Sequence, residues 1–393
     1  MITRTGSSIA ILMALALLGP AARAQDKLKI GFISTLSSPA SSVGPELRDG
    51  FRLAIKDLDG KLGGRDVDLV IGDDQMKPDV GVQLAHKMMD EDKVQLITGV
   101  VLSNITLAVA HAVLPRKTFM LSLNAGPSQL AGPECNPYFF AVSYQNDQPS
   151  EGMGLYLDKK AIETASLIAA NYAAGRDFLS GFKRTFKGKI VSETYTPLDQ
   201  FDFAAELAEI RAANPEAVFF FYTSGAPSIN LVKQFAEAGL KGKIALYGLN
   251  FSLDEQTLPG MGDAAVGVED ATLWNADLDN PQNRTFVAHF KAAYNRMPSI
   301  FASFAYDGAH LLDSALHAVD GHIERQDEFR KAMEAAKFAS VRGAFRFGNN
   351  HFPIQNVYLA QIERDSSGTL YNAYRSLIVA DLADSYAGQC KMR

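Results

Sequence analysis

The sequence predicts an α/β protein made of two lobes. Short runs of aliphatic and β-branched residues alternate with amphipathic helical patterns along most of the chain, which is typical of parallel sheets covered by helices on both faces. About eight such units are present, more than one open twisted sheet usually holds. A stretch rich in Pro, Gly and Asn, residues 126–149, divides them into two groups. Each group therefore predicts one Rossmann-like lobe.

The first group begins with an apolar run at residues 28–34, expected to be a strand. A helix is expected over 46–59, because Leu47, Phe51 and Ile55 recur at the spacing of one helical face. The alternation continues with strands expected at 65–71, 94–98 and 118–122, and helices at 78–91 and 103–114.

The second group repeats this rhythm and then gives way to a different composition after Trp274. Helices with little strand pattern between them follow, and two late apolar runs close the chain. Strands are expected at 164–169, 189–195, 217–222 and 243–247, helices at 282–295, 301–318 and 326–336, and late strands at 341–346 and 357–364.

The N-terminal segment predicts export. Arg4 precedes an apolar run over residues 9–18, and Ala22-Arg23-Ala24 offers a small-x-small cleavage site, so residues 1–24 form an expected signal peptide. The alternative is an uncleaved anchor or a buried helix, but the apolar run is too short to span a bilayer. The periplasm is the expected compartment.

Composition excludes several classes of protein. The 393 residues are 47% hydrophobic and 21% charged, which is typical of a folded, water-soluble chain. The net charge of −6 has no basic cluster, so nucleic-acid binding is not expected. Cys135 and Cys390 are the two cysteines, and in an oxidising compartment such a pair favours a disulfide over two free thiols.

Motifs for catalysis are absent from the sequence. It contains no P-loop, no G-x-G-x-x-G, no H-E-x-x-H and no G-x-S-x-G. The seven histidines are scattered, and none has the spacing of a metal-binding helix. We therefore expect neither an enzyme nor a bound metal or cofactor.

Two loops are better candidates for binding. Residues 99–106 lead from a buried strand into a helix, with Ser103 at the expected N-cap. Residues 122–127 follow the next strand, at the same edge of the sheet. Helix N-termini attract anions, and α/β ligands bind at the carboxyl edge of the sheet, so this pair of loops indicates an anion site. Ordinary helix capping is the alternative.

Several segments in order resemble type I periplasmic solute-binding proteins of the branched-chain amino-acid ABC transporters. They are LGGRDVDLVIGDDQMKPDVGVQLAHKMM, TGVVLSNITLAVAHAVL, FMLSLNAGPSQLAG, NYAAGRDFLSGFK and FAAELAEIRAANPEAVFFFY, and the resemblance covers residues 29–369. The segment VRGAFRFGNNHFPIQNVYLAQI and the cysteine pair look more like the branch that binds benzoate and hydroxycinnamate derivatives.

The resemblance implies a set of ligand-binding residues. Ser103 and the backbone of Asn124, Ala125 and Gly126 would hold a ligand carboxylate in the first lobe. From the second lobe Tyr172 and Tyr222 would face it, and Tyr306 would line the pocket wall.

One departure from the family concerns the ligand's charge. Asn250 is the eighth expected ligand-binding residue, and it stands near the position where amino-acid-binding members have an acid that pairs with the ligand ammonium. A buried ammonium needs a compensating charge, so its loss favours an aromatic or other carboxylate without an amine. Branched-chain amino acids and small amides are the alternatives, and Asp254 could turn inward instead.

The resemblance further implies capture by closure of two lobes joined by hinge crossovers near Gln145, Trp274 and His351. Residues 25–145 with 275–351 would form the N-terminal lobe, and residues 146–274 with 352–393 the C-terminal lobe. The expected partner is an inner-membrane ABC permease, and the chain is expected to be a monomer. A ligand sensor with the same fold and an exported enzyme are the alternatives.

Overall fold

The computed structural model describes residue 2 and residues 27–392. The predicted signal peptide, residues 1–24, therefore lies outside the described residues apart from residue 2. In the part of the chain that the structure describes, no helix is long and apolar enough to cross a membrane.

The first lobe contains a six-stranded sheet in the order β2-β3-β1-β4-β5-β6. All neighbouring strands are parallel except β2, which forms a hairpin with β3. The strands are β1 Leu28–Ser34, β2 Lys61–Leu62, β3 Arg65–Asp73, β4 Leu96–Thr98, β5 Phe119–Ser122 and β6 Phe139–Ala141. The helices of this lobe are α1 Val43–Asp57, α2 Pro78–Lys87 with a π-turn at Met88–Asp92, α3 Ser103–Val113 with a 3₁₀ turn at Leu114–Arg116, α4 Ser128–Ala131, α10 Pro281–Tyr294, α11 Ile300–His317 and α12 Gln326–Ala335.

The second lobe contains an eight-stranded sheet in the order β12-β13-β11-β10-β9-β7-β8, with β14 paired to β13. Its parallel part runs from β8 to β11, and β13 joins β11 antiparallel. The strands are β7 Thr164–Ala170, β8 Lys189–Thr196, β9 Ala217–Phe221, β10 Ala245–Leu249, β11 Glu269–Thr272, β12 Arg346–Phe347, β13 Pro353–Arg364 and β14 Leu370–Leu382. The helices are α5 Asp147–Lys159, α6 Ala173–Thr185, α7 Ala204–Ala213, α8 Ala226–Glu237 and α9 Leu258–Met261, with 3₁₀ turns at Gly262–Ala264 and Ala387–Gln389.

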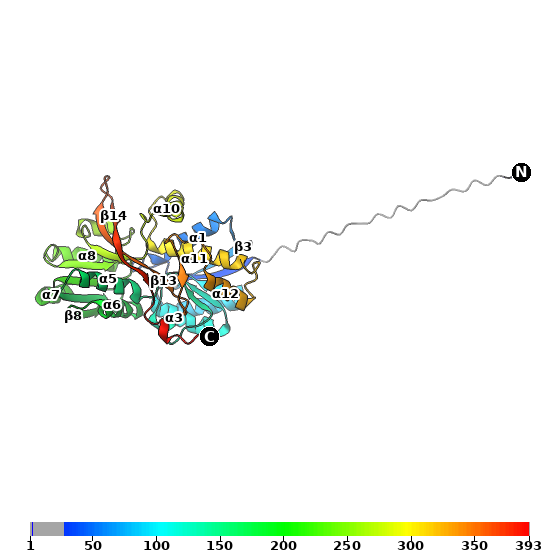
Figure 1. Ribbon diagram of the computed structural model, residues 1–393, viewed down its shortest axis with the longest axis horizontal. Helices are drawn as coiled ribbons and strands as arrows, with labels where there is room; N and C mark the ends of the chain where they lie inside the picture. The colour runs from blue at the N-terminus through cyan, green and yellow to red at the C-terminus, as the bar shows by residue number, and fades with distance from the viewer. Residues whose placement is uncertain (1, 3–26, 393) are drawn as a thin grey trace.

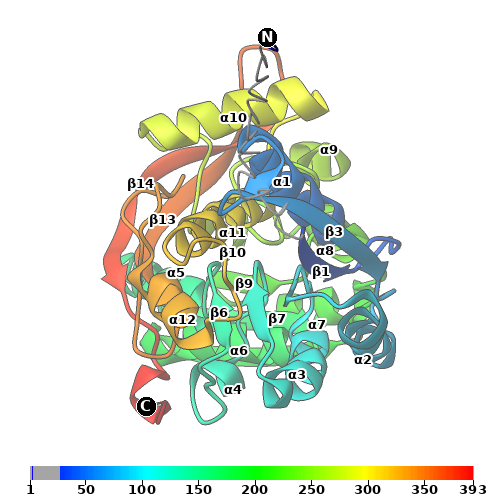
Figure 2. The same cartoon turned by 90° about the vertical axis from the view of Figure 1, so that its right-hand side faces the viewer.

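The chain passes between the two sheets three times. It leaves the first sheet after β6, returns to the helices of the first lobe after β11, and crosses again before β12. Figure 1 shows α5 to α8 on one side, and α1, α3, α11 and α12 on the other, with β13 and β14 running between them. Turning the molecule by 90° brings the first lobe to the front (Figure 2). The predicted two-lobed α/β fold is confirmed.

The sequence reading is wrong at residues 341–346, where a strand was expected. The backbone N–H of Val341 donates to Asp307 in α11 at 2.9 Å, and the Arg342 guanidinium also binds Asp307. Because α11 holds this segment, only Arg346–Phe347 pair as a strand. The stretch 126–149 also contains more structure than its turn-rich composition indicates, since β6 lies within it and α5 begins there.

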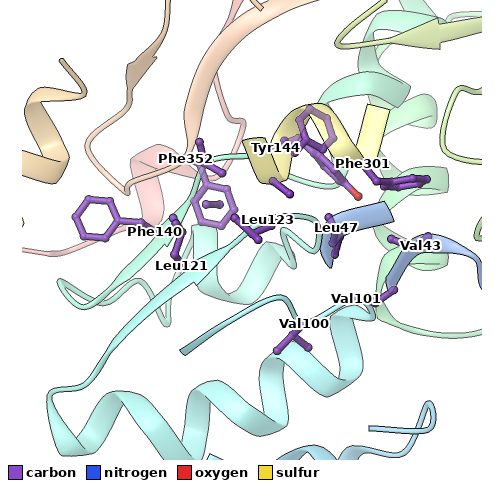
Figure 3. Packing of buried hydrophobic residues seen from close by; sticks show 14 of the residues in the cluster. Val43, Leu47, Val100, Val101, Leu121, Leu123, Phe140, Tyr144, Phe301 and Phe352 are labelled. Carbon is purple, nitrogen blue, oxygen red and sulfur yellow. The ribbon is translucent and has the colours of Figure 1, made fainter. Parts of the chain in front are cut away.

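One apolar core fills the first lobe and continues across the lobe boundary onto one face of the second sheet, and a second core covers the other face of that sheet. Figure 3 shows Tyr144 and Phe301 beside each other at this boundary, above Leu47 of α1 and Leu123. All four side chains are buried. The part of the lobe boundary that these four residues form is therefore apolar.

A disulfide joins Cys135, between α4 and β6, to Cys390 near the C-terminus, with the Cα atoms 5.6 Å apart. The segment after β14 leaves the second sheet and ends beside the first lobe (Figure 1). On the way, Tyr386 contacts Asp147 in α5, and the carbonyl of Ala387 accepts from Asn349. The structure thus pairs the two cysteines across the lobe boundary.

Candidate functional site

Both sheets turn their topological switch points toward one another. In the first sheet the strand order reverses at β1, so the loops after β1 and β4 diverge there. In the second sheet it reverses at β7, between β8 and β9. Ligands of open α/β sheets bind outside the carboxyl ends of the strands at these points. The loops after β4, β5, β7 and β9 are therefore the expected place for a site.

A small cavity of about 10 Å³ lies between these loops, which is room for about one water molecule. In this closed form the walls of the cavity therefore pack against one another with little free space between them. The first lobe contributes half of its lining and the second lobe the other half. The lining residues are Val101, Ser103, Asn124, Ala125, Tyr144 and Phe301 from the first lobe, and Tyr172, Ala174, Phe178, Phe221, Thr223 and Phe251 from the second.

The first-lobe wall is polar because helix α3 begins there. Ser103 is the first helical residue, so it does not cap the helix as expected. Its Oγ accepts a hydrogen bond from Asn146 Nδ2 at 3.1 Å, which leaves the hydroxyl proton free to donate. The backbone N–H groups of the first turn have no partner within the helix. This wall thus presents neutral donors at a helix N-terminus.

Asn124 lies in the neighbouring loop and is fixed by three hydrogen bonds. Its Nδ2 donates to the carbonyl of Val101 at 2.7 Å, and its Oδ1 accepts from the Tyr144 hydroxyl at 2.9 Å. Its carbonyl accepts from Ser143 Oγ at 2.9 Å. Since the side chain is engaged, the loop can offer the cavity its backbone and the adjacent Ala125.

The second-lobe wall combines a second helix N-terminus with aromatic rings. Helix α6 begins after Tyr172, and Ala174 in its first turn lines the cavity. The hydroxyls of Tyr172 and Thr223 have no hydrogen-bond partner among residues 27–392. Burial raises the pKa of Tyr172 well above its usual value, so the phenol stays neutral and can donate.

Aromatic rings make most of the remaining surface. Phe178 lies with its centroid 4.0 Å from that of Phe221 and 5.8 Å from that of Phe251. Phe251 also stacks on Tyr144 of the first lobe at 4.5 Å and contacts Phe301 at 5.9 Å. Rings at such separations contact one another directly, so a ligand ring would have to pack against them in place of one of these contacts. The second-lobe wall therefore offers an aromatic surface suited to contact with a flat apolar body.

No residue in the described lining carries a formal charge, but a carboxyl lies directly behind it. Asp177 in α6 accepts from Ser128 N at 3.0 Å, Ser128 Oγ at 2.8 Å and Asn146 Nδ2 at 2.9 Å. Burial raises the pKa of Asp177 to about 6, and these hydrogen bonds oppose the rise. Asn146 donates to both Asp177 and Ser103, so it connects the two lobes behind the cavity.

The lobes also touch on the other side of the cavity. Ser42 N donates to the carbonyl of Ser224 at 2.8 Å, and Ala226 N donates to the carbonyl of Pro39 at 3.1 Å. A Cβ added to Gly225 would lie 2.6 Å from the Ala40 carbonyl oxygen. Because both sides of the cavity are bridged, the structure has the two lobes closed.

Four of the eight expected ligand-binding residues line the cavity: Ser103, Asn124, Ala125 and Tyr172. Gly126 does not, since its N–H donates to Asn146 Oδ1 at 3.0 Å. The Tyr222 hydroxyl bonds Thr196 Oγ1 at 2.7 Å in the other core of the second lobe. These two residues face away from the cavity.

Tyr306 and Asn250 also lie outside the lining. The Tyr306 hydroxyl donates to Asp57 Oδ2 at 3.0 Å, so its ring points to the outer side of α11. Asn250 is buried beside Asp270, to which its side chain hydrogen-bonds. In the loop after β10, it is Phe251 that turns into the cavity.

Sequence reasoning missed six lining residues besides Val101 and Ala174. Two of them could have been found from side-chain periodicity: Phe221 alternates with Phe220 along β9, and Phe178 lies one turn beyond Ala174 in α6. The six are Tyr144, Phe178, Phe221, Thr223, Phe251 and Phe301.

Residues 27–369 match the model of a protein family described as periplasmic binding protein. A curated relative from Brucella melitensis, named Leu/Ile/Val-binding protein homolog 6, is 28% identical over 374 residues, or 92% of this chain and 94% of the relative.

Solved structures are similar over nearly the whole chain. A solute-binding protein of an ABC transporter from R. palustris, in complex with benzoate, is 31% identical with a TM-score of 0.88, over 93% of this chain and 100% of that one. One from Rhodopseudomonas palustris BisB5, in complex with 3,4-dihydroxybenzoic acid, is 30% identical with a TM-score of 0.84, over 92% and 99%. A leucine-binding protein from Thermotoga maritima, 19% identical with a TM-score of 0.77 over 89% and 98%, shares the fold.

Proposed function

The chain belongs to the periplasmic binding protein family, as a solute-binding protein of the ABC-transporter type, and we propose that it captures a small aromatic carboxylate of the benzoate or hydroxycinnamate type. The observation that carries this proposal is the composition of the cavity. One wall offers neutral hydrogen-bond donors at a helix N-terminus, the other walls are aromatic rings, and the described lining has no charged side chain.

The polar wall suits a carboxylate. Hydrogen bonds to an anion are shorter and stronger than those between neutral groups, and a helix N-terminus adds a favourable dipole. In our proposal the Ser103 hydroxyl, the first N–H groups of α3 and the backbone at Asn124 and Ala125 hold the carboxylate, with Tyr172 or Thr223 donating from the second lobe. No arginine or lysine is required.

The aromatic walls suit the ring of the ligand. Phe178, Phe221 and Phe251 from the second lobe, with Tyr144 and Phe301 from the first, surround the position that a ring would take. An aromatic ligand would replace water there and add offset or edge-to-face contacts. An aliphatic chain would gain the first benefit but not the second.

A branched-chain amino acid is the second candidate, because curated relatives are named Leu/Ile/Val-binding protein homologs. The cavity argues against it. An ammonium buried in this cavity would meet no carboxylate in the described lining, and an unpaired buried charge is costly. Asn250 and Asp254 cannot serve as its partner without turning, since both are buried outside the lining.

Capture would follow the closure seen in the structure. Ligand contacts on both lobes favour the closed form over the open one, so binding shifts the population toward closure. We propose that the exported protein then delivers its ligand to an inner-membrane ABC permease. A ligand sensor with the same fold would bind the same solute without a permease, so uptake in a strain lacking the permease distinguishes the two.

A thermal-shift screen followed by calorimetry tests the ligand class. Benzoate, 4-hydroxybenzoate and leucine are compared, with benzamide as the uncharged analogue and cyclohexanecarboxylate as the non-aromatic one. A ligand at 100 times its Kd stabilises the native state by about 2.7 kcal/mol. We expect benzoates to raise the melting temperature most, and both analogues to bind more weakly. A shift with leucine alone would overturn the proposal.

A further inference from the structure

A second group of buried polar side chains lies next to the cavity and has no part in the proposed contacts. It is carried by the loop after β10, residues 250–257, which also places Phe251 in the cavity. Ser252 fixes this loop to the second lobe, since its Oγ donates to the Tyr222 carbonyl at 2.6 Å and accepts from Tyr222 N at 3.1 Å. Asn372 Nδ2 donates to the Leu253 carbonyl at 2.8 Å. The loop therefore moves with the second lobe.

The far end of this loop meets the first lobe. Gln256 Nε2 donates to the carbonyl of Met297 at 3.2 Å, in the segment between α10 and α11. Glu46 of α1 is buried beside this segment, where Ser299 Oγ donates to it at 2.8 Å and Arg296 approaches it at 2.7 Å. Glu46 lies close enough to Asp254 and Glu255 to interact electrostatically with both. Carboxyls from the two lobes thus face each other.

The cluster holds more acceptors than donors. Asp254 Oδ2 and Glu255 Oε2 are buried without a hydrogen-bond partner in the described part of the chain, and the buried Asp270, which Asn250 hydrogen-bonds, lies near Glu255. Arg296 is the cation that contacts Glu46, but it also contacts Asp49 at 2.7 Å. If all these groups were ionised, the closed form would contain buried like charges with a single guanidinium among them.

Other charged groups around the cluster do not relieve this excess. Asp254 accepts from the backbone N–H groups of Gln256 and Thr257, at 2.9 and 3.1 Å, and interacts with Glu255. Asp270 interacts with Glu255 and Glu269. Glu269 is paired with Lys160 at 3.1 Å on the outer side of the second lobe. The charges facing the cluster are therefore mostly negative.

We propose that closure of the lobes takes up protons from solvent at the carboxyl cluster of Glu46, Asp254 and Glu255, which makes the closed, ligand-bound form more favourable at lower pH. In the open form these groups would face the water-filled gap between the lobes and ionise normally. On closure a carboxylate binds a proton from solvent and becomes a neutral acid that can donate to one of the unpartnered oxygens. The inference rests on the proposed capture by closure.

The direction of the pH dependence follows from the closed form. Burial raises the pKa of Glu46, Asp254 and Glu255 each to about 7, and the neighbouring carboxyls add to the rise. For groups whose pKa is higher in the closed form, the favourable contribution is complete at low pH and is lost as the pH rises through that value. Ligand affinity should therefore fall between pH 6 and pH 8, by about tenfold for each group that titrates on closure.

Calorimetric titration of the full exported chain with benzoate tests the proposal. Measurements at pH 7 in two buffers with different heats of ionisation give the number of protons taken up, and titrations at pH 6 and pH 8 give the change in Kd. Benzoate is an ordinary carboxylate and stays ionised over this range. We expect net proton uptake and at least a tenfold weaker Kd at pH 8. Zero uptake with a constant Kd would overturn the inference.

Neutral variants locate the protons. Glu46→Gln and Asp254→Asn should each reduce the uptake and flatten the pH dependence of Kd. Glu91→Gln, at an exposed position in the first lobe, is the matched control and should behave like the unchanged chain. Unchanged proton uptake in both cluster variants would also overturn the inference.

The ligand class and the proton uptake can fail separately. If benzoate does not bind, the proposed function fails, and closure is then followed without ligand by small-angle X-ray scattering. A smaller radius of gyration at pH 6 than at pH 8, lost in Glu46→Gln, would support the inference. Equal radii at the two pH values would contradict it.

Discussion

The two walls of the cavity differ in chemistry although both lie at the carboxyl edge of a parallel sheet. The first-lobe wall is built on the N-terminus of α3, with Ser103 and the loop at Asn124 as its polar groups. The second-lobe wall is dominated by rings, Phe178, Phe221 and Phe251. One lobe is thus suited to the anionic end of a ligand and the other to its apolar body. In the proposed function each wall contacts a different part of the ligand, so recognition would require closure.

The largest expected effect comes from removing a ring that contacts both walls. Phe251→Ala deletes the stacking on Tyr144 and the contact with Phe178. Loss of a buried Phe costs about 3–5 kcal/mol of stability, and we expect benzoate affinity to fall at least 100-fold as well.

The control for this variant is Phe329→Ala, which removes an equally buried ring that packs on Phe119 in the first lobe. It should lower stability, measured by urea unfolding, and leave affinity unchanged. If the two variants changed Kd equally, the loss of affinity would reflect lower stability of the protein and not the loss of a ring that contacts the ligand.

Removing the hydroxyl of the polar wall should have the next largest effect. Ser103→Ala deletes a donor to the ligand carboxylate, and hydrogen bonds to charged groups contribute about 1.5–3 kcal/mol. We therefore expect a 10- to 150-fold weaker Kd for benzoate by calorimetry. The loss should be much smaller for benzamide, which carries no charge. An equal loss of affinity for benzoate and benzamide would contradict the proposal that the first-lobe wall binds the carboxylate.

A block to closure should weaken both walls together. Gly225→Ala would place a Cβ against the Ala40 carbonyl of the opposite lobe, a clash present only when the lobes are closed. We expect an affinity loss of about 1–3 kcal/mol, comparable to other strained backbone positions. Gly239→Ala is the control, because Gly239 also has a positive φ of 68° but open space around it. Unchanged affinity in Gly225→Ala would separate binding from closure.

The smallest expected effect distinguishes two tyrosines of the second lobe. Tyr172→Phe removes a hydroxyl without a partner at the cavity, whereas Tyr222→Phe removes one bonded to Thr196. A neutral hydrogen bond contributes about 0.5–1.5 kcal/mol, so Tyr172→Phe should weaken benzoate binding 2- to 12-fold. Tyr222→Phe should cost stability but leave Kd unchanged. If Kd were unchanged in Tyr172→Phe and weaker in Tyr222→Phe, Tyr222 and not Tyr172 would be the residue that donates to the ligand from the second lobe.

The fold could be predicted from hydrophobic periodicity, because an error of one or two residues in the bounds of a long apolar pattern does not change which element it predicts. The direction of a side chain, by contrast, is predicted wrongly after an error of a single residue. In a strand such as β9, moving by one residue from Phe221 to Tyr222 turns the side chain to the other face of the sheet. The same single-residue step separates Asn250 from Phe251 in the loop after β10. The loops after β4 and β5 were easier to place, since a helix N-terminus presents backbone groups whatever side chain follows.

Strands at the edge of the second sheet were missed for a different reason. β14 contains the apolar run Leu-Ile-Val-Ala at residues 377–380, but Tyr374 and Leu377 are exposed, because only one side of the strand is paired and much of it faces solvent. An apolar run of four residues does not by itself distinguish a strand from a helix segment, so the pattern did not identify β14.

The Cys135–Cys390 disulfide adds a connection between the lobes that depends on oxidation. Three peptide segments cross between the sheets whenever the chain is folded, but the fourth connection exists only after oxidation. A reduced chain would therefore swing on three connections and an oxidised one on four, with the tail acting as a covalent stop on how far the lobes separate. The range of the hinge would then be set by the redox state of the compartment in which the protein matures.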